Sequence, residues 1–266
     1  MQPSLEAANV SKYFFDRAGE PRRVLDNISL TVQTGEFVAI VGASGCGKTT
    51  FIRCAAGLIP IEEGSIKIDG KLVTGPATNR GFVFQHDSLL PWRNVLRNIL
   101  FGPEARRDKP QVMEALGASL LKLVGLSGYE HHFPHELSGG MRQRVNLARA
   151  LAIDPAVLLM DEPFAALDAQ TREIMQAELL QVCVESKKTV LFITHQIEEA
   201  LYLADRVVVF SSQPGRIVAD VAVPFARPRE LSRKRTPEFL DLVDHIWRLI
   251  ERDVVAAIRR PASMSA

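Results

Sequence analysis

Short apolar runs alternate along the chain with longer stretches in which apolar residues recur every three or four positions. This alternation is typical of β-strands and α-helices that succeed one another around a mostly parallel sheet. The apolar runs predict strands over residues 5–10, 28–32, 37–41, 81–84, 157–160, 189–193 and 207–210. The periodic stretches predict helices over residues 48–57, 169–186 and 197–204.

The stretch from residue 87 to 152 shows a different pattern. It contains no convincing strand run, only helical periodicity interrupted by Gly and Pro. We therefore predict an α-helical subdomain over 87–152, inserted in an α/β core that comprises residues 1–86 and 153–223.

The end of the chain changes composition twice. Residues 224–237 are rich in Pro, Arg and Ser and predict a linker, whereas apolar residues from Phe239 to Ile258 follow the spacing of an amphipathic helix. That helix is expected to pack on its own domain or a sister subunit, or else to lie on a membrane surface. The linker carries a basic stretch, which is either a solvated loop or a contact for a partner or phospholipid headgroup: Arg227, Arg229, Arg233, Lys234 and Arg235.

Composition narrows the class of protein. With 32 Lys and Arg against 31 Asp and Glu, the chain has no global field that favours nucleic acid. Its three cysteines form neither a disulfide framework nor a metal motif, which suits a reducing compartment such as the cytoplasm. No 18 apolar residues run together, so a membrane role requires another protein to span the bilayer.

A glycine-rich segment follows the strand predicted at 37–41 and precedes the helix that begins near residue 48. It fits the P-loop pattern, in which backbone N–H groups surround phosphate oxygens at a helix N-terminus. Lys48 is expected to reach the β- and γ-phosphates of a nucleotide, and the Thr49 hydroxyl to bind Mg²⁺. Because a strand and a helix flank the segment, a glycine-rich turn without a ligand is the weaker interpretation. The predicted phosphate-binding residues are Gly42, Ala43, Ser44, Gly45, Cys46, Gly47, Lys48, Thr49 and Thr50.

Two carboxylates end the apolar run that starts at Val157. A strand placed there brings Asp161 to a Mg²⁺ site and Glu162 to a position from which it polarises an attacking water. Taken alone, such a run is more often a strand that enters a solvated turn. Because a P-loop precedes this run in the chain, the interpretation as a Mg²⁺ and water site is favoured here.

The segment Leu137-Ser138-Gly139-Gly140-Met141-Arg142-Gln143-Arg144 resembles the LSGGQ signature of ABC ATPases. Ser138 is also a good N-cap for the helix that follows, and both roles are compatible. In that family Ser138, Gly139 and Gly140 would bind the γ-phosphate held by the opposite subunit.

Four further positions match motifs of that family in the expected order. Phe14 resembles the aromatic residue that stacks on adenine, with Tyr13 as the alternative and simple packing in the first strand as another. Gln85 resembles the glutamine that approaches Mg²⁺ and water, Asp168 the D-loop aspartate that contributes to the nucleotide site, and His195 the switch histidine. By itself a histidine after a strand is usually an ordinary turn or core residue.

The resemblance implies a P-loop NTPase core of the ABC type, with a mostly parallel sheet, an antiparallel β portion and the inserted helical subdomain. It implies catalysis by Glu162, His195 and Gln85, and Mg²⁺ bound with ATP by Thr49, Gln85 and Asp161. It also implies a head-to-tail dimer with a second copy, transmembrane permease subunits and, indirectly, a periplasmic solute-binding protein. Such a subunit is peripheral, on the cytoplasmic face of the inner membrane, and does not bind nucleic acid.

The segment from His86 to Trp92 narrows the resemblance further. Its Leu-Leu-Pro-Trp sequence is similar to the one found at this place in the nitrate, sulfonate and taurine importer ATPases. In those proteins the region helps to form the groove that receives a permease helix. The alternative is that Leu89, Leu90 and Trp92 simply pack the subdomain. The resemblance therefore implies the ATPase of a bacterial importer. The alternatives are the ATPase of an exporter and a soluble ABC ATPase, although the latter usually carries two cassettes or a long coiled coil.

Overall fold

The apolar runs form strands at all seven predicted places. In the computed structural model, which describes residues 3–16, 19–85, 88–165 and 167–258, these strands are β1 (Leu5–Phe15), β2 (Pro21–Val32), β3 (Phe37–Gly42), β6 (Arg80–Val83), β7 (Val157–Asp161), β8 (Thr189–Ile193) and β9 (Arg206–Phe210). Three further strands were not predicted: β4 (Glu63–Ile68), β5 (Lys71–Leu72) and β10 (Ile217–Ala222).

The predicted helices also form. They are α1 (Lys48–Ala56), α6 (Ala169–Ser186), α7 (Ile197–Leu203) and the C-terminal α8 (Pro237–Ile258). The stretch without predicted strands holds α2 (Val95–Ile99), α3 (Phe101–Arg106), α4 (Pro110–Leu123), the short 3-10 helix η1 (Pro134–Glu136) and α5 (Gly139–Leu151), and a second 3-10 helix, η2 (Leu231–Arg235), precedes α8. None of the described helices is both long enough and apolar enough to cross a bilayer.

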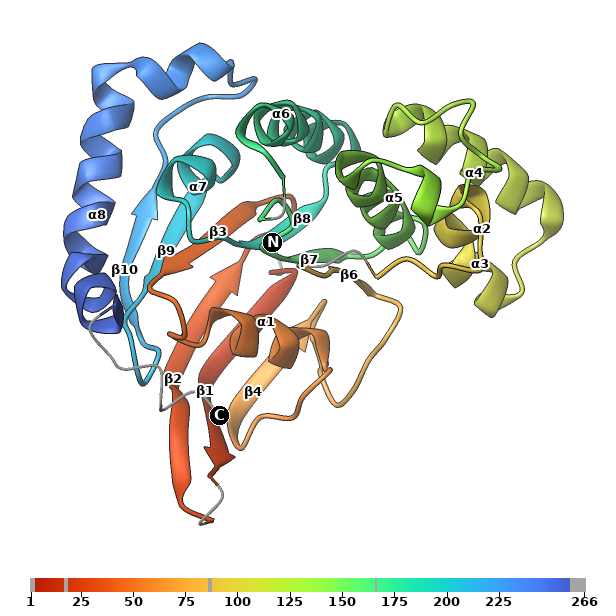
Figure 1. Cartoon of the computed structure of the whole chain (residues 1–266). Helices are drawn as coiled ribbons and strands as arrows, with labels where there is room; N and C mark the ends of the chain where they lie inside the picture. The colour runs from red at the N-terminus through yellow and green to blue at the C-terminus, as the bar shows by residue number, and fades with distance from the viewer. Residues whose placement is uncertain (1–2, 17–18, 86–87, 166, 259–266) are drawn as a thin grey trace. The chain divides into compact units, whose positions relative to one another are not determined.

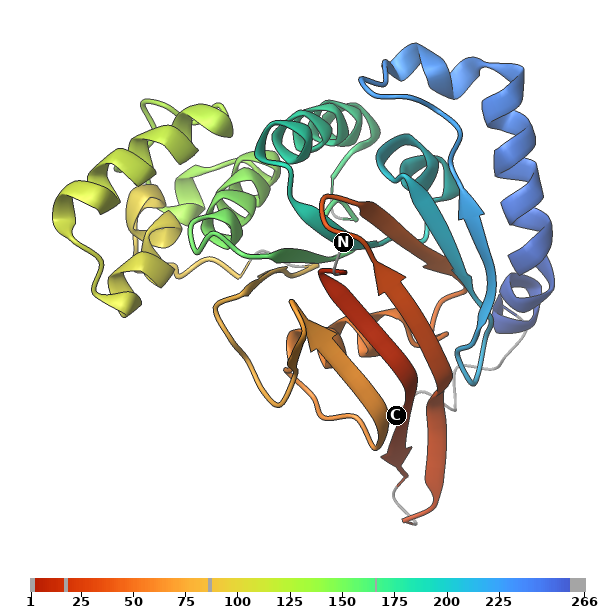
Figure 2. The same ribbon diagram turned by 180° about the vertical axis from the view of Figure 1, so that it is seen from behind.

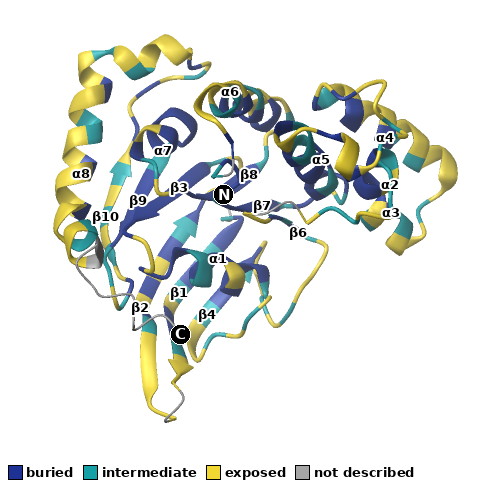
Figure 3. Cartoon of the chain, viewed as in Figure 1, coloured by how far each residue is buried: buried dark blue, intermediate teal, exposed yellow. Residues whose placement is uncertain are grey.

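The chain folds into two units. The larger unit comprises Met1–Pro76 and Leu191–Ala266. It holds an antiparallel sheet in the order β2-β1-β4-β5, and a second set of strands in which β9 lies between antiparallel β10 and parallel β3, with β8 next to β3. Helix α1 packs against β2 and β3 (Figure 1). Because β3 is buried along its whole length, the loop that follows it starts from a fixed position (Figure 3).

The smaller unit comprises Ala77–Val190. Strands β6 and β7 pair in parallel there, so both have their carboxyl ends on one edge. Helices α2, α4 and α5 contact one another, and Leu120, Leu121 and Val145 are buried among them. The α/β class with an antiparallel portion and added helices is thus confirmed, whereas the domain boundaries at residues 87, 152 and 224 stay predictions.

The amphipathic helix α8 packs on its own unit, which is one of the alternatives left open by the sequence. Phe239, Ile246 and Ile250 are buried, and α8 contacts α7, β9 and β3. Both views show α8 running beside β9 and β10 (Figure 1, Figure 2). Its remaining apolar side chains, among them Leu240 and Trp247, are exposed.

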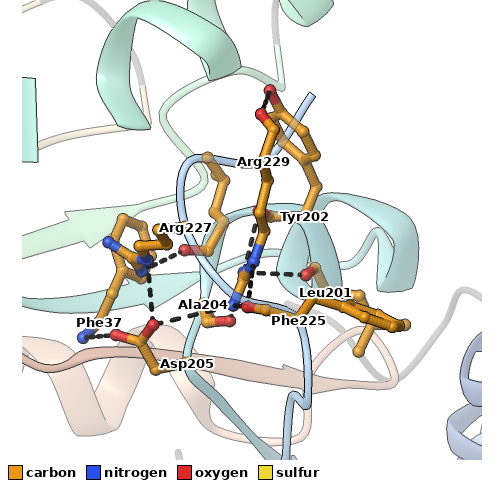
Figure 4. A network of polar contacts seen from close by, with 9 residues as sticks. Phe37, Leu201, Tyr202, Ala204, Asp205, Phe225, Arg227 and Arg229 are labelled. Carbon is orange, nitrogen blue, oxygen red and sulfur yellow. Dashed lines mark hydrogen bonds and ion pairs between the residues drawn. The ribbon is translucent and has the colours of Figure 1, made fainter. Parts of the chain in front are cut away.

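The basic stretch before α8 is not simply a solvated loop. Arg229 is buried, and its guanidinium donates to the carbonyl oxygens of Leu201 (3.2 Å), Tyr202 (3.0 Å) and Ala204 (2.7 Å) at the end of α7 (Figure 4). It also donates twice to the Phe225 carbonyl. A cation is favourable at the carbonyl end of a helix, so Arg229 fixes the path of the chain between β10 and α8.

A second charge supports this arrangement. The Asp205 carboxylate accepts from the Phe37 backbone N–H (2.9 Å) at the start of β3, and it pairs with Arg227 at 3.0 Å (Figure 4). Burial lowers the pKa of Arg229 to about 10, with a smaller effect from neighbouring Arg227, so Arg229 stays charged at neutral pH. Segment 225–229 is therefore part of the packed fold.

Replacing Arg229 by Met is expected to lower the free energy of unfolding by about 2–4 kcal/mol, because several buried carbonyls lose their donor at once. Arg235→Met is the matched control, since residue 235 is exposed in the same basic stretch. Denaturant unfolding followed by circular dichroism measures both variants. Equal stability of the two would contradict the structural role of Arg229.

Candidate active site

The glycine-rich segment forms a tight loop between β3 and α1, as predicted. Gly45 and Gly47 have φ values of 74° and 102°, which L side chains rarely adopt. A Cβ atom on Gly47 would also lie 2.8 Å from the Leu25 side chain and 3.1 Å from the Val24 carbonyl oxygen. Glycine at position 47 is therefore required both by backbone conformation and by close packing on β2.

Lys48 turns back into this loop. Its side chain is buried, and Nζ donates to the Gly42 carbonyl (2.8 Å) and the Ala43 carbonyl (3.0 Å) and lies 3.7 Å from Cys46 Sγ. These acceptors are neutral, so they do not compensate the ammonium charge. The N-cap residue of α1, Gly47, has no side chain to cap the first turn. A buried ammonium beside an uncapped helix N-terminus suits the phosphates of a nucleotide.

Cys46 is a structural rather than a reactive part of the loop. Burial raises the pKa of its thiol, and the Lys48 ammonium opposes that shift only in part. The thiol is therefore protonated at neutral pH and is a poor nucleophile. Ser44 and Gly45 are exposed, and Thr49 and Thr50 are half-buried, so the loop presents its polar middle to a ligand.

The two predicted carboxylates lie at the end of β7 in the smaller unit. Asp161 is buried as the last residue of the strand. Glu162 follows with a φ of 45°, a left-handed conformation that is uncommon for a residue other than glycine. Such strain often accompanies a functional position, because the surrounding structure must hold the residue in place.

The structure brings together two of the predicted catalytic residues. The Gln85 side chain, two residues after β6, lies with Nε2 at 3.4 Å from Glu162 Oε2. Parallel pairing of β6 and β7 places both residues beyond the same sheet edge. An amide donor beside a carboxylate orients it, and an oriented carboxylate is suited to accept a proton from water.

The sequence predicted that Ser138 caps a helix, and this is confirmed. Ser138 is the N-cap residue of α5, and its hydroxyl oxygen accepts from the Met141 backbone N–H at 3.3 Å. A hydroxyl that accepts in this way still has its own O–H to donate. Capping is therefore compatible with a phosphate contact, and Gly139 and Gly140 form the first turn of the same helix.

Asp168 also serves as an N-cap, at the start of α6. Its carboxylate accepts from the Thr171 backbone N–H at 2.9 Å, and this hydrogen bond holds the pKa of Asp168 below its usual range. His195 is exposed two residues after β8, in the larger unit. The roles of Asp168 and His195 toward a nucleotide stay predictions.

Tyr13 and Phe14, the two aromatic candidates near the end of β1, have different surroundings. The Tyr13 ring is covered by the Arg23 guanidinium, and its hydroxyl bonds to Arg23 and, at 3.3 Å, to Glu63. Phe14 is 44% exposed and contacts Lys12 with an ammonium-to-centroid distance of 5.1 Å. Phe14 is thus the better candidate for stacking on adenine, and packing in the strand does not explain its exposure.

The sequence did not reveal a polar cluster around Ser88, three residues after Gln85 in the chain. Arg149 of α5 donates to the Ser88 carbonyl (2.8 Å), the Ser88 hydroxyl (2.5 Å) and Asn146 Oδ1 (2.7 Å). The three-residue spacing of Asn146 and Arg149 was the available signal, because it places them on one helix face. The cluster fixes the chain three residues after Gln85. His86 and Asp87, which belong to the predicted importer segment, lie outside the described residues.

The same segment ends in an exposed aromatic residue. Trp92 is 72% exposed, whereas Leu89 and Leu90 are half-buried. The subdomain-packing alternative therefore fails for Trp92. A large exposed indole suits a surface that a partner covers.

The phosphate loop between β3 and α1 and the two carboxylates at the end of β7 are each typical of P-loop nucleotide-hydrolysing proteins. Residues 25–165 match the family described as ABC transporter. A chain of Methanocaldococcus jannaschii named "Uncharacterized ABC transporter ATP-binding protein MJ0412" is 46% identical over 259 residues, which are 97% of this chain and 96% of that protein. The Escherichia coli K12 protein named "Taurine import ATP-binding protein TauB" is 46% identical over 243 residues, 89% of this chain and 94% of that protein.

A solved structure agrees with these relatives. The ATP-binding cassette MJ0796, in a dimeric post-hydrolysis state bound to ADP and Pi, superposes with a TM-score of 0.72 at 30% identity and covers 84% of this chain and all of its own. The chain therefore belongs to the ABC transporter family. It is an ATP-hydrolysing subunit of that family.

Proposed function

We propose that this chain energises an ABC importer for taurine, another sulfonate, nitrate or a similar small solute. The observation that carries the proposal is the 46% identity to the taurine import ATP-binding protein of Escherichia coli K12 over 89% of the chain. The exposed Trp92 in the Leu-Leu-Pro-Trp segment supports it, because an importer ATPase needs a surface for its permease. The proposed place of action is the cytoplasmic face of the membrane, against the permease.

The roles of the site residues follow the resemblance. Lys48 and the amides of the phosphate loop bind the phosphates, Phe14 stacks on adenine, and Glu162 accepts a proton from the attacking water, with Gln85 and His195 positioning the reacting groups. Ser138, its neighbouring glycines and Asp168 complete the site held by the opposite subunit. Closure of the dimer on ATP then moves the permease.

The predicted metal-binding residues have side chains that suit Mg²⁺. Among the described residues no three His, Cys, Asp or Glu side chains gather into a metal cluster. Mg²⁺ in nucleotide sites usually needs only one or two protein oxygens beside the phosphates and water. In the proposed site the carboxylate of Asp161, with Thr49 and Gln85, would supply oxygen donors of that kind, and the bound metal would neutralise phosphate charge.

The test is reconstitution of the chain with a permease and a solute-binding protein found among its genomic neighbours. ATP hydrolysis in proteoliposomes is expected to rise several-fold when the binding protein is loaded with taurine, another sulfonate or nitrate. A complex that hydrolyses ATP but responds to none of these solutes would contradict the substrate class. Transport directed outward, without a binding protein, would show an exporter instead.

A further inference from the structure

A turn much later in the chain packs directly against the phosphate loop. Residues 211–215, between β9 and β10, form this turn, and we refer to it as the 211–215 turn. A Cβ atom on Gly215 would lie 2.2 Å from the Cys46 carbonyl oxygen, so the backbone of the turn rests directly on the loop. The Gln213 side chain approaches the other side, with Nε2 3.7 Å from a Cβ atom placed on Gly45.

The same turn is joined to β2 beneath the loop. The Gly215 N–H donates to the Val24 carbonyl at 2.8 Å, and the Asp26 N–H donates to the Gly215 carbonyl at 3.0 Å. Val24 and Leu25 are the residues that pack against Gly47. The phosphate loop is therefore enclosed by β2 and the 211–215 turn, and a shift of either changes the space available to Gly45 and Gly47.

The outer end of the turn is held by the C-terminal helix. Asp253 of α8 accepts a hydrogen bond from the Ser212 backbone N–H, with Oδ2 2.7 Å from the nitrogen. Other bonds close the turn on itself, from Ser211 N to Arg216 O (2.9 Å) and from Arg216 N to Ser211 Oγ (3.2 Å). Asp253 thus provides a bond between this turn and an element 41 residues further along the chain. Gln213 at its tip has a φ of 31°, a conformation that the closed turn must maintain.

We propose that Asp253 is a positioning residue for ATP binding: its carboxylate holds the 211–215 turn against the phosphate loop, and it does not touch the nucleotide. This rests on the proposed role of residues 42–49 in binding the phosphates. Loop amides bind an anion well only when they are already oriented, because ordering them during binding costs affinity. Helix α8 therefore contributes to nucleotide affinity through a single carboxylate.

Asp253→Ala is expected to raise the Kd of the purified full chain for a fluorescent ATP analogue with Mg²⁺ by about fivefold to tenfold. The KM for ATP should rise by a similar factor, with kcat within about twofold. Asp253→Asn should behave almost like the wild type, because its amide oxygen can still accept from Ser212 N–H. Asp244→Ala, an exposed carboxylate on the same helix, is the control and should leave Kd unchanged.

Hydrogen–deuterium exchange without nucleotide supplies an independent measurement. In Asp253→Ala the peptides covering residues 211–215 and 42–49 should exchange faster, whereas those of β1 should not. An unchanged Kd in Asp253→Ala, an Asn variant as weak as the Ala variant, or an equal loss in Asp244→Ala would each overturn the proposal. If Lys48→Ala still binds ATP normally, the assignment of the phosphate loop itself is wrong. That result is distinguishable from a failure of the role proposed for Asp253, because it does not depend on the Asp253 variants.

Discussion

Replacing Glu162 by Gln is expected to lower the rate of ATP hydrolysis by about 10²–10⁴ while nucleotide binding persists. Glutamine has nearly the same shape and preserves the approach of Gln85, but its amide cannot accept a proton from water. Since the nucleotide stays intact, dimers with bound ATP should accumulate. Phosphate release measures the first effect, and size-exclusion chromatography with MgATP measures the second.

Asp154→Asn is the control for this variant. Asp154 also has a positive φ, 50°, and pairs with Lys188 at 2.5 Å, but it lies before β7 rather than after it. Its amide variant should hydrolyse ATP at nearly the wild-type rate. If Glu162→Gln hydrolyses normally and stays monomeric with MgATP, Glu162 is not the base.

Lys48→Ala is expected to weaken ATP binding by about tenfold to hundredfold and to remove measurable turnover. The reason is the loss of a charge-assisted contact to the phosphates at a buried position, where water does not replace it. Isothermal titration with MgATP and a phosphate-release assay measure the two effects.

Lys71→Ala, which changes an exposed lysine of β5 in the same unit, is the matched control and should be silent. Circular dichroism checks that both variants are folded, because Lys48 also donates to the Gly42 and Ala43 carbonyls. If Lys48→Ala hydrolysed ATP at the wild-type rate, the assignment of the phosphate loop would be wrong.

The sequence predicted every strand that is buried along its whole length, and it missed the three strands that have two or fewer buried residues. Strands β3, β7 and β8 are buried at every residue, so each reads as a continuous apolar run. Strand β10 alternates between half-buried and exposed residues at the edge of its sheet, and β4 opens with two exposed residues. Strands β4 and β10 therefore bury too few apolar residues to be distinguished from loops by sequence pattern.

The same contrast applies to the site. The phosphate loop and the Ser138 cap are local, because the residues that define them are neighbours in sequence. Arg229 and Asp253 bond over 25 to 41 positions to partners that only the folded chain brings to them. The Pro-, Arg- and Ser-rich composition around Arg229 is typical of a solvated basic loop, so the sequence does not indicate that this residue is buried. Nothing in the sequence distinguishes Asp253 from the other acidic residues of α8.

In the proposed dimer two subunits complete each ATP site, with Lys48 from one and Ser138 from the other. Ser138→Arg should leave ATP binding by the monomer nearly intact and block dimer closure and turnover, because a bulky cation occupies the helix start that the γ-phosphate approaches. In a mixture of Ser138→Arg and Lys48→Ala subunits, each mixed dimer has one site with both lesions and one with neither.

The decisive measurement is the ATPase rate of that mixture against the rates of each variant alone. Recovery to a substantial fraction of the wild-type rate, with a maximum near equal amounts of the two variants, is the result we predict. A mixture no more active than its inactive components would contradict completion of the site by the second subunit.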